Sequence, residues 1–223
     1  MNSLHFVKSK LFYPLTVFYA VFFIGCMEGP PQESGNFRDS DLVELITLDS
    51  TFHLDIRYAT NNNFVGKPVY TEARAFLQWP AAMALAEVNK ELKPLGYGLV
   101  IFDGYRPWSI TKTFWDITPE DKKQFVANPK NGSRHNRGCA IDCSLYEISS
   151  GKEIPMPSEY DEMTERAYPS FKGATEEEQR MRDLLISKMR ARGFEVYEYE
   201  WWHFDYKDWK QYRIQNIPFS EIK

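Results

Sequence analysis

Two apolar runs of strand length set the strongest limit on how this chain folds. YGLVIFD (97–103) and GCAIDCSLYEI (138–148) are each followed by turn-forming residues, as expected of strands buried within a sheet. Alternation or aromatic content predicts three further strands, at LVELITL (42–48), FHLDIRYA (52–59) and FEVYEYEWWHF (194–204).

Helical patterns occur between these strands in an irregular order. Apolar residues at helical spacing predict a helix that begins at Pro80 and ends before Pro94, and one or two helices are expected within 107–127. Thr175 and Glu178 form a capping box ahead of a further amphipathic helix. Because helices and strands do not alternate strictly, we predict a single α+β domain with a largely antiparallel central sheet flanked by helices.

The first 25 residues do not resemble the start of a folded domain. Two lysines precede LFYPLTVFYAVFFI, an apolar run too short and too poorly flanked for a comfortable membrane span, and Gly25-Cys26 follows. This order is typical of a bacterial secretory signal, and a small residue before cysteine resembles the lipoprotein processing box. We expect an exported protein that faces the periplasm and meets the membrane only through a lipid on Cys26. An ordinary cleaved signal peptide is the alternative.

The composition of the chain predicts a flexible N-terminal tether followed by an acidic domain. Residues 26–41 are rich in Pro, Gly, Ser and acidic side chains and predict a flexible tether, which leaves 42–223 as the domain. A net charge of −4 does not suggest nucleic-acid binding. Cys139 and Cys143 would lie about 13 Å apart on one strand, too far for a disulfide, so we predict two buried free thiols. The sequence does not indicate the oligomeric state.

Histidine is scarce in the chain after the predicted signal. Only His53, His135 and His203 remain, and His53 is most simply a solvated side chain on the polar face of a strand. His135 stands seven positions before Asp142, an odd separation that would place the two on opposite faces of one strand. Both can reach one metal only if His135 belongs to a preceding loop, and Gly138 permits that bend. A loop histidine and an unrelated strand aspartate are the alternative.

The tetrapeptide EWWH (200–203) places a carboxylate three positions before an imidazole. In zinc hydrolases a histidine can hold the metal while a glutamate takes a proton from the attacking water. A regular strand would again separate Glu200 and His203 onto opposite faces. We therefore predict a kink or tight turn at Trp201-Trp202. Taken alone, the tetrapeptide also fits an aromatic core strand that ends in a hydrogen-bonded histidine.

Together these residues predict a catalytic metal site. His135, Asp142 and His203 would supply two nitrogens and one oxygen and leave a fourth tetrahedral position for water, as in catalytic zinc sites. The sequence contains no HExxH motif, which excludes the helix-borne zinc peptidases. We predict one Zn²⁺ per chain with Glu200 as general base, although iron or cobalt could use the same ligands.

Two motifs carry a resemblance to a known family. SRHNRGCAID (133–142) and EWWH resemble the SxHxxGxAxD and ExxH patterns of the zinc D-alanyl-D-alanine dipeptidases, the enzyme type found in vancomycin-resistance clusters. Their wider fold group includes D,D-carboxypeptidases and the hedgehog signalling domain. The likeness continues through YAT..NFVGKPVY, DGYRP and SEYDEMTERA and runs in order from about residue 43 to 218.

The resemblance also implies roles for residues outside the metal site. Arg106 of DGYRP looks like the arginine that stabilises the tetrahedral intermediate, and a turn arginine paired with Asp103 is the alternative. Ser133 is similar to the serine that helps to hold the C-terminal carboxylate of the substrate. Asp161 corresponds to the aspartate that receives the free ammonium group, and Tyr70 or a nearby aromatic residue is expected to form a wall of the pocket.

The resemblance implies hydrolysis of the dipeptide D-Ala-D-Ala to two D-alanines during turnover of cell-wall peptides. One alternative is a D,D-carboxypeptidase that trims longer wall peptides. The other is a non-catalytic, zinc-containing lipoprotein that binds the wall. Glu200 and Arg106 favour an enzyme, because a protein that only binds needs neither residue.

Overall fold

The computed structural model describes residues 29–223. The predicted secretory signal (1–25) and the predicted lipidation at Cys26 lie outside these residues. Within the described part of the chain, no helix has the length and apolar character needed to cross a bilayer.

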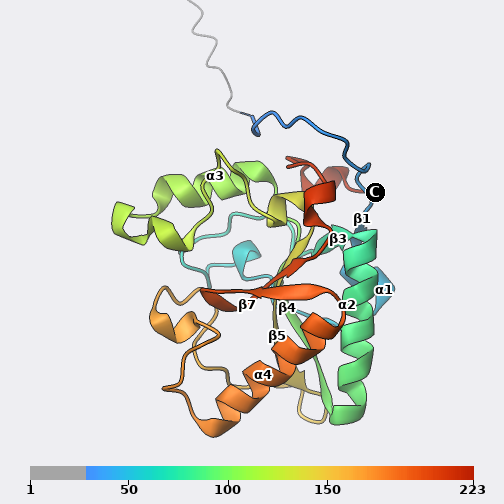
Figure 1. Cartoon of the computed structure of the whole chain (residues 1–223), viewed down its shortest axis with the longest axis vertical. Coiled ribbons are helices and arrows are strands. Elements are labelled where there is room, and N and C mark those ends of the chain that lie inside the picture. Colours follow the sequence, from blue (N-terminus) through green and yellow to red (C-terminus); the bar gives the residue numbers. More distant parts are fainter. Residues whose placement is uncertain (1–28) are drawn as a thin grey trace, which may run out of the picture.

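A five-stranded sheet forms the centre of the domain (Figure 1). Its strands follow the order β2 (His53–Leu54), β4 (Tyr97–Asp103), β5 (Ala140–Glu147), β7 (Glu200–Tyr206) and β6 (Phe194–Tyr197). The β2–β4 pair is parallel and the other three pairs are antiparallel. A smaller antiparallel sheet joins β1 (Leu42–Glu44) and β3 (Phe76–Gln78). The predicted α+β class with a largely antiparallel sheet is therefore confirmed.

Two long helices pack against each other and against the central sheet. The helix α2 (Trp79–Leu92) lies on β4, and α4 (Glu176–Ala191) lies on β5, β6 and β7. The predicted capping box at Thr175 and Glu178 is present in full at the start of α4. In Figure 1, α3 (Trp108–Ile117) lies on the opposite side of β7 from α4.

Short 3₁₀ segments connect the longer elements: η1 (Arg57–Ala59), η2 (Lys93–Leu95), η3 (Glu120–Phe125), η4 (His135–Arg137), η5 (Glu165–Ala167), η6 (Trp209–Gln211) and η7 (Phe219–Glu221). The two cysteines of β5 and its approach, Cys139 and Cys143, are buried and free, as predicted.

Three of the predicted strands differ from the structure. The run 42–48 is a strand only to Glu44, because its partner β3 is three residues long, and α1 (Leu45–Leu48) follows. The run 52–59 pairs only at β2 and then enters η1. The run 194–204 is a hairpin rather than one strand, because the chain turns between β6 and β7 and the two halves pair with each other.

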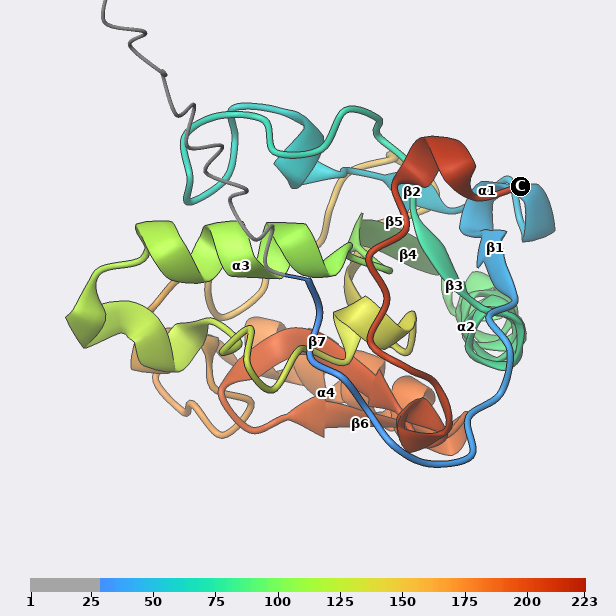
Figure 2. The same cartoon turned by 90° about the horizontal axis from the view of Figure 1, so that it is seen from above.

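The N-terminal segment is held to the domain from Glu33 onward, which corrects the prediction of a flexible tether over 26–41. The carboxylate of Glu33 accepts a hydrogen bond from the backbone N–H of Ile214 at 2.7 Å and pairs with Arg137 at 2.5 Å. Its backbone carbonyl accepts from Arg213 at 2.8 Å. Figure 2 shows the segment running beside the C-terminal part of the chain. Composition could not predict this, because the partners are more than a hundred positions away.

Candidate active site

Neighbouring strands bring two of the predicted metal ligands together. Asp142 of β5 and His203 of β7 are direct cross-strand partners, so their side chains leave the sheet side by side. His135 comes from η4, immediately before β5, as the sequence predicts. Gly138 ends η4 with a φ of +67°, a left-handed conformation that lets the chain turn into the strand.

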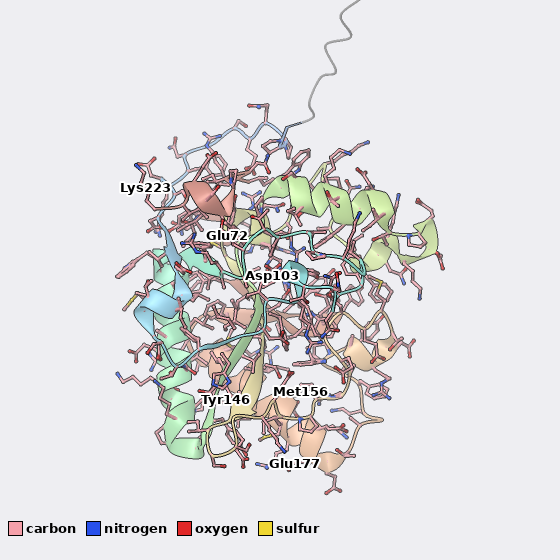
Figure 3. The ribbon with its side chains drawn as sticks, turned by 180° about the vertical axis from the view of Figure 1, so that it is seen from behind. Glu72, Asp103, Tyr146, Met156, Glu177 and Lys223 are labelled. Carbon is pink, nitrogen blue, oxygen red and sulfur yellow. The ribbon has the colours of Figure 1, made fainter. Side chains whose placement is uncertain are left out.

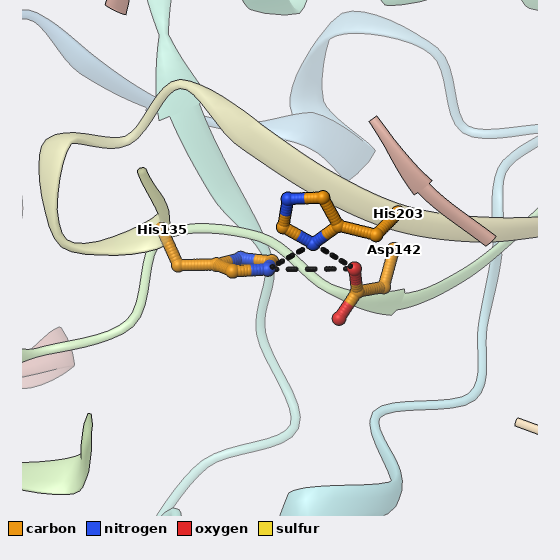
Figure 4. Close-up of side chains that lie close together, drawn as sticks. All are labelled: His135, Asp142 and His203. Atoms are coloured by element: carbon orange, nitrogen blue, oxygen red, sulfur yellow. Dashed lines mark hydrogen bonds and ion pairs between the residues drawn. The ribbon is translucent and has the colours of Figure 1, made fainter. Parts of the chain in front are cut away.

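The three side chains converge on one point, as Figure 4 shows. His135 Nε2 lies 3.1 Å from His203 Nδ1 and 3.4 Å from Asp142 Oδ1, and the latter two atoms are 3.0 Å apart. All three residues are buried. Two imidazole nitrogens and one carboxylate oxygen facing a common centre form a donor set that fits a divalent transition metal such as zinc.

Outer contacts fix which nitrogen of each histidine faces that centre. The Nδ1–H of His135 donates to the backbone carbonyl of Gly104 at 2.7 Å, which turns Nε2 inward. The Nε2–H of His203 donates to Asp205 Oδ1 at 3.1 Å, which turns Nδ1 inward. Contacts of this kind set the tautomer and orientation of metal-binding histidines. Both histidines are therefore oriented for binding a cation.

Electrostatics also suits a cation at this point. Burial alone would raise the pKa of Asp142, but His135 and His203 lower it well below its usual value, so the carboxylate is ionised. Burial would lower the pKa of His203, whereas Asp205 and Asp142 raise it. The cluster therefore favours positive charge, which a bound metal ion would supply.

Glu200 faces the same centre despite its odd separation from His203. Its Oε2 lies 3.8 Å from His203 Nδ1, and burial raises its pKa to about 7. The predicted kink or tight turn at Trp201-Trp202 is present as a bulge and not as a turn, because β7 is a strand from Glu200 to Tyr206 but residues 201–203 have no pairing partner in β6. This register shift against β6 brings the two residues together. Val196 of β6 pairs with Phe204 of β7, but the next residue of β6, Tyr197, pairs with Glu200, four positions away from Phe204.

These groups lie in a cavity of about 130 Å³. Its charged lining includes Arg106, Asp161 and Glu200 beside the three ligand residues. Aromatic and apolar side chains form the remaining wall, among them Tyr58, Phe64, Phe114, Met163 and Trp202. A cavity of this size and lining suits a small, charged substrate.

Arg106 is fixed at the edge of the cavity by the residues behind it. Its Nε and Nη2 donate to Asp103 Oδ2 at 2.9 and 2.7 Å, so the Asp103 pairing considered as an alternative is present. The guanidinium also lies over the rings of Phe114 and Tyr58, at 4.9 and 5.3 Å. Arg106 therefore both pairs in the turn and presents a rigid positive charge to the cavity.

Asp161 presents an unpaired acceptor. Its Oδ1 accepts a hydrogen bond from the hydroxyl of Tyr58 at 2.9 Å, whereas Oδ2 is buried and has no hydrogen-bond partner among residues 29–223. Burial raises its pKa to about 8. Its backbone has a φ of +64°, a conformation that costs a non-glycine residue about 1–3 kcal/mol and that recurs at functional sites. An ammonium group would satisfy the free oxygen.

Two predicted substrate contacts do not line the cavity, which is a correction for Tyr70. The Tyr70 hydroxyl donates to Asp103 Oδ1 at 2.8 Å, so its ring lies behind Arg106 and supports the Asp103 pair. The Ser133 hydroxyl accepts from the backbone N–H of His135 at 3.1 Å and thereby shapes η4. Its contact with a substrate carboxylate stays a prediction.

Comparison with known proteins decides the family. The family model described as Peptidase_M15, D-ala-D-ala dipeptidase, matches residues 38–221. The chain belongs to this family. It is accordingly a hydrolase of the metallopeptidase class, and the predicted resemblance is confirmed.

Curated relatives of the dipeptidase family cover most of the chain. The D-alanyl-D-alanine dipeptidase of Enterococcus faecalis is 36% identical over 178 residues, which span 70% of this chain and 88% of the relative. The enzyme of the same name from Escherichia coli is 33% identical over 181 residues, or 81% and 92% of the two chains. Among solved structures, the vancomycin-resistance D,D-dipeptidase VanXYg has a TM-score of 0.42 at 21% identity, over 80% of this chain and 59% of that one.

Sequence reasoning missed several residues of this dipeptidase-family site. Asp205 orients His203. The only feature of the sequence that could have indicated this role is that Asp205 follows His203 by two positions and so lies on the same face of the strand. Tyr58 of η1 donates a hydrogen bond to Asp161, which lies 103 positions later in the sequence. Tyr160 donates to Asp142 Oδ2 at 3.0 Å, and nothing but its place beside Asp161 pointed to it.

Replacement of Gly138 by alanine is expected to lower the free energy of unfolding by about 1–2 kcal/mol, since φ is positive there. A Cβ would also come within 2.5 Å of Leu42 Cδ2, so either the Leu42 side chain or η4, which carries His135, would have to shift. Differential scanning calorimetry and metal titration measure the two effects. Gly151→Ala is the control, because Gly151 has a φ of +69° but open space around it. Equal stability and metal affinity in both variants would show that η4 tolerates the shift.

Proposed function

We propose that this protein is a zinc-dependent D-alanyl-D-alanine dipeptidase that hydrolyses D-Ala-D-Ala to two D-alanines. The observation that carries the proposal is the convergence of His135, Asp142 and His203 on one point, with the Glu200 carboxylate beside them. Membership of the D-ala-D-ala dipeptidase family supplies the substrate class.

One Zn²⁺ per chain fits the donor set of two nitrogens and one oxygen. When bound, zinc would polarise the substrate carbonyl and make a water molecule easier to deprotonate. His135, Asp142 and His203 would hold the ion, and their outer contacts to Gly104 and Asp205 keep the donor atoms in place.

Glu200 would act as general base and then as general acid. It accepts the proton of the attacking water, and it later delivers a proton to the amine that leaves when the peptide bond breaks. Burial supports both roles, because it raises the carboxyl pKa to about 7, where the group can gain or lose a proton near neutral pH.

Arg106 would stabilise the negative charge that develops on the carbonyl oxygen. Its guanidinium is already held by Asp103, Phe114 and Tyr58, so little reorganisation accompanies the reaction. The carboxylate of Asp103 also partly balances the buried positive charge before substrate binds.

Recognition of both charged ends would restrict the enzyme to dipeptides. Asp161 Oδ2 would accept the free ammonium group, while Ser133 would contribute to binding of the C-terminal carboxylate. A capped or longer peptide has no ammonium at this point and would leave Asp161 buried without its partner, which is costly.

The proposal is tested by comparing D-Ala-D-Ala, L-Ala-L-Ala and N-acetyl-D-Ala-D-Ala as substrates of the zinc-loaded protein. We expect cleavage of the first, and a kcat/KM at least about 100-fold lower for the acetylated peptide, because acetylation removes the ammonium group. Asp161→Asn should reduce the difference in kcat/KM between D-Ala-D-Ala and the acetylated peptide, because the variant no longer selects for the charged amine. Measurement of released D-alanine gives the rates.

Other outcomes of this comparison would support the alternative functions. Equal cleavage of the acetylated peptide would indicate a D,D-carboxypeptidase that acts on longer wall peptides. Zinc binding without cleavage of any substrate would indicate a wall-binding protein. Glu200 and Arg106 both line the cavity, which favours an enzyme.

For its location, we propose export to the periplasmic face of a membrane, with a lipid on Cys26 as the anchor. The support is the order of residues in the N-terminal 26 positions. There the enzyme would meet D-Ala-D-Ala released during wall turnover.

A further inference from the structure

The two oxygens of the Asp142 carboxylate have different surroundings. Oδ1 faces the histidine nitrogens, at 3.0 Å from His203 and 3.4 Å from His135. Oδ2 accepts a hydrogen bond from the hydroxyl of Tyr160 at 3.0 Å. Arg106 Nη2 is also near Oδ2, but at 3.8 Å it lies beyond hydrogen-bond distance. The Tyr160 hydroxyl is therefore the group that fixes Oδ2.

The ring of Tyr160 is held firmly enough to aim its hydroxyl. It stacks on Phe102 of β4 with centroids 4.5 Å apart and an interplanar angle of 26°. Trp202 packs against it edge-to-face at 5.5 Å. The guanidinium of Arg57 lies 4.9 Å from the Phe102 centroid and 5.7 Å from that of Tyr160. With a side chain 6% exposed and aromatic contacts on several sides, the ring has little freedom to move.

Fixing one oxygen decides how the carboxylate can bind a metal ion. A carboxylate free to rotate can offer both oxygens and raise the coordination number, or can turn away and weaken binding. Partners that hold the outer atoms of a ligand typically account for a 10–100-fold change in metal affinity. With Oδ2 held by Tyr160, Asp142 offers Oδ1 alone.

We propose that Tyr160 is a positioning residue for the metal site, which keeps Asp142 a one-oxygen ligand and so preserves an open coordination position. The inference rests on the proposed metal site. Tyr160 is not among the residues that line the cavity, so it acts through Asp142 and not on the substrate.

The test is the Tyr160→Phe variant, which keeps the ring and removes only the hydroxyl. We expect its zinc affinity, measured by competition with a chromophoric chelator, to fall about 10–100-fold. At saturating zinc, kcat should fall while KM for D-Ala-D-Ala stays within about twofold of wild type, since Tyr160 does not touch the substrate. In the cobalt(II)-loaded protein, the visible absorption bands should weaken, because higher coordination numbers give weaker bands than tetrahedral ones.

Tyr146→Phe is a matched control. Tyr146 is also 6% exposed, and its hydroxyl donates to the backbone carbonyl of Thr51 at 2.9 Å. Figure 3 shows Tyr146 well away from Asp103, the strand partner of Asp142. Loss of this hydroxyl should leave zinc affinity and the cobalt spectrum unchanged, while its effect on thermal stability reports the general cost of removing a buried hydrogen bond.

Two results would overturn the inference in different ways. If wild type and Tyr160→Phe bind zinc equally and have the same cobalt spectrum, Tyr160 has no positioning role and the proposed function stands. If wild type binds neither metal, the proposed function itself fails. A drop in affinity shared by Tyr146→Phe would also contradict the inference, because it would reflect lost stability alone.

Discussion

Replacement of Glu200 by glutamine is expected to lower kcat for D-Ala-D-Ala by about 1,000-fold, within the range for loss of a general base. Glutamine keeps the size and shape of the side chain but cannot accept the proton of the attacking water. Zinc content should stay at the wild-type level, because Glu200 is not one of the three converging ligands. Steady-state kinetics together with metal analysis of the same sample provide the measurement.

Stability should not account for this loss. Burial disfavours the ionised form of Glu200, as its raised pKa shows, so a neutral amide is tolerated at the same place. Glu198→Gln is the matched control, since Glu198 is exposed in the same hairpin. Retention of more than about a tenth of wild-type kcat in Glu200→Gln would be far above the expected loss and would assign the base to another group.

Removal of the metal by a chelator is expected to abolish hydrolysis and to lower the melting temperature by about 5–10 °C. A ligand at 100 times its dissociation constant stabilises the folded state by about 2.7 kcal/mol, and each kcal/mol shifts the melting temperature of a domain of this size by about 2–4 °C. The ligands come from η4, β5 and β7, so one ion would connect three elements. Differential scanning fluorimetry before and after zinc is restored measures the shift.

A pair of histidine variants makes this prediction specific. His203→Ala should show no response of the melting temperature to zinc or chelator, because it lacks one of the three ligands. His53→Ala should respond as wild type does, since His53 is exposed on β2. A chelator that leaves activity and melting temperature unchanged in wild type would exclude a functional metal at this site.

Local patterns in the sequence predicted the parts of the fold that depend on nearby residues. The strand β4 has the predicted bounds, and the capping box of α4 is present, because burial of a short apolar run and a four-residue cap are local events. The strand that ended early at Glu44 depended on the length of its partner β3, and the strand that ended at Leu54 depended on how far the chain runs alongside β4. Pairing partners cannot be inferred from the run itself.

In the candidate site, too, features that depend on nearby residues could be predicted and features that depend on distant residues could not. His135 could be placed in a loop because an odd spacing from Asp142 and a glycine between them left few options. A kink at Trp201-Trp202 could be predicted from the odd separation of Glu200 and His203, but its form could not, since it depends on the register of β7 against β6. Tyr160 and Asp205 act through side-chain contacts that only the folded chain brings together.

The contacts of Glu33 set how far the enzyme could stand from a membrane. Were Cys26 to carry a lipid, six residues would separate it from Glu33, and the seven steps between the two would reach at most about 25 Å at roughly 3.5 Å per step. A tether that was free to residue 41 would have allowed about twice that distance. Arg137 and Ile214, by holding Glu33, would confine the catalytic cavity to a thin layer beside the bilayer, where it would sample dipeptides released close to that surface.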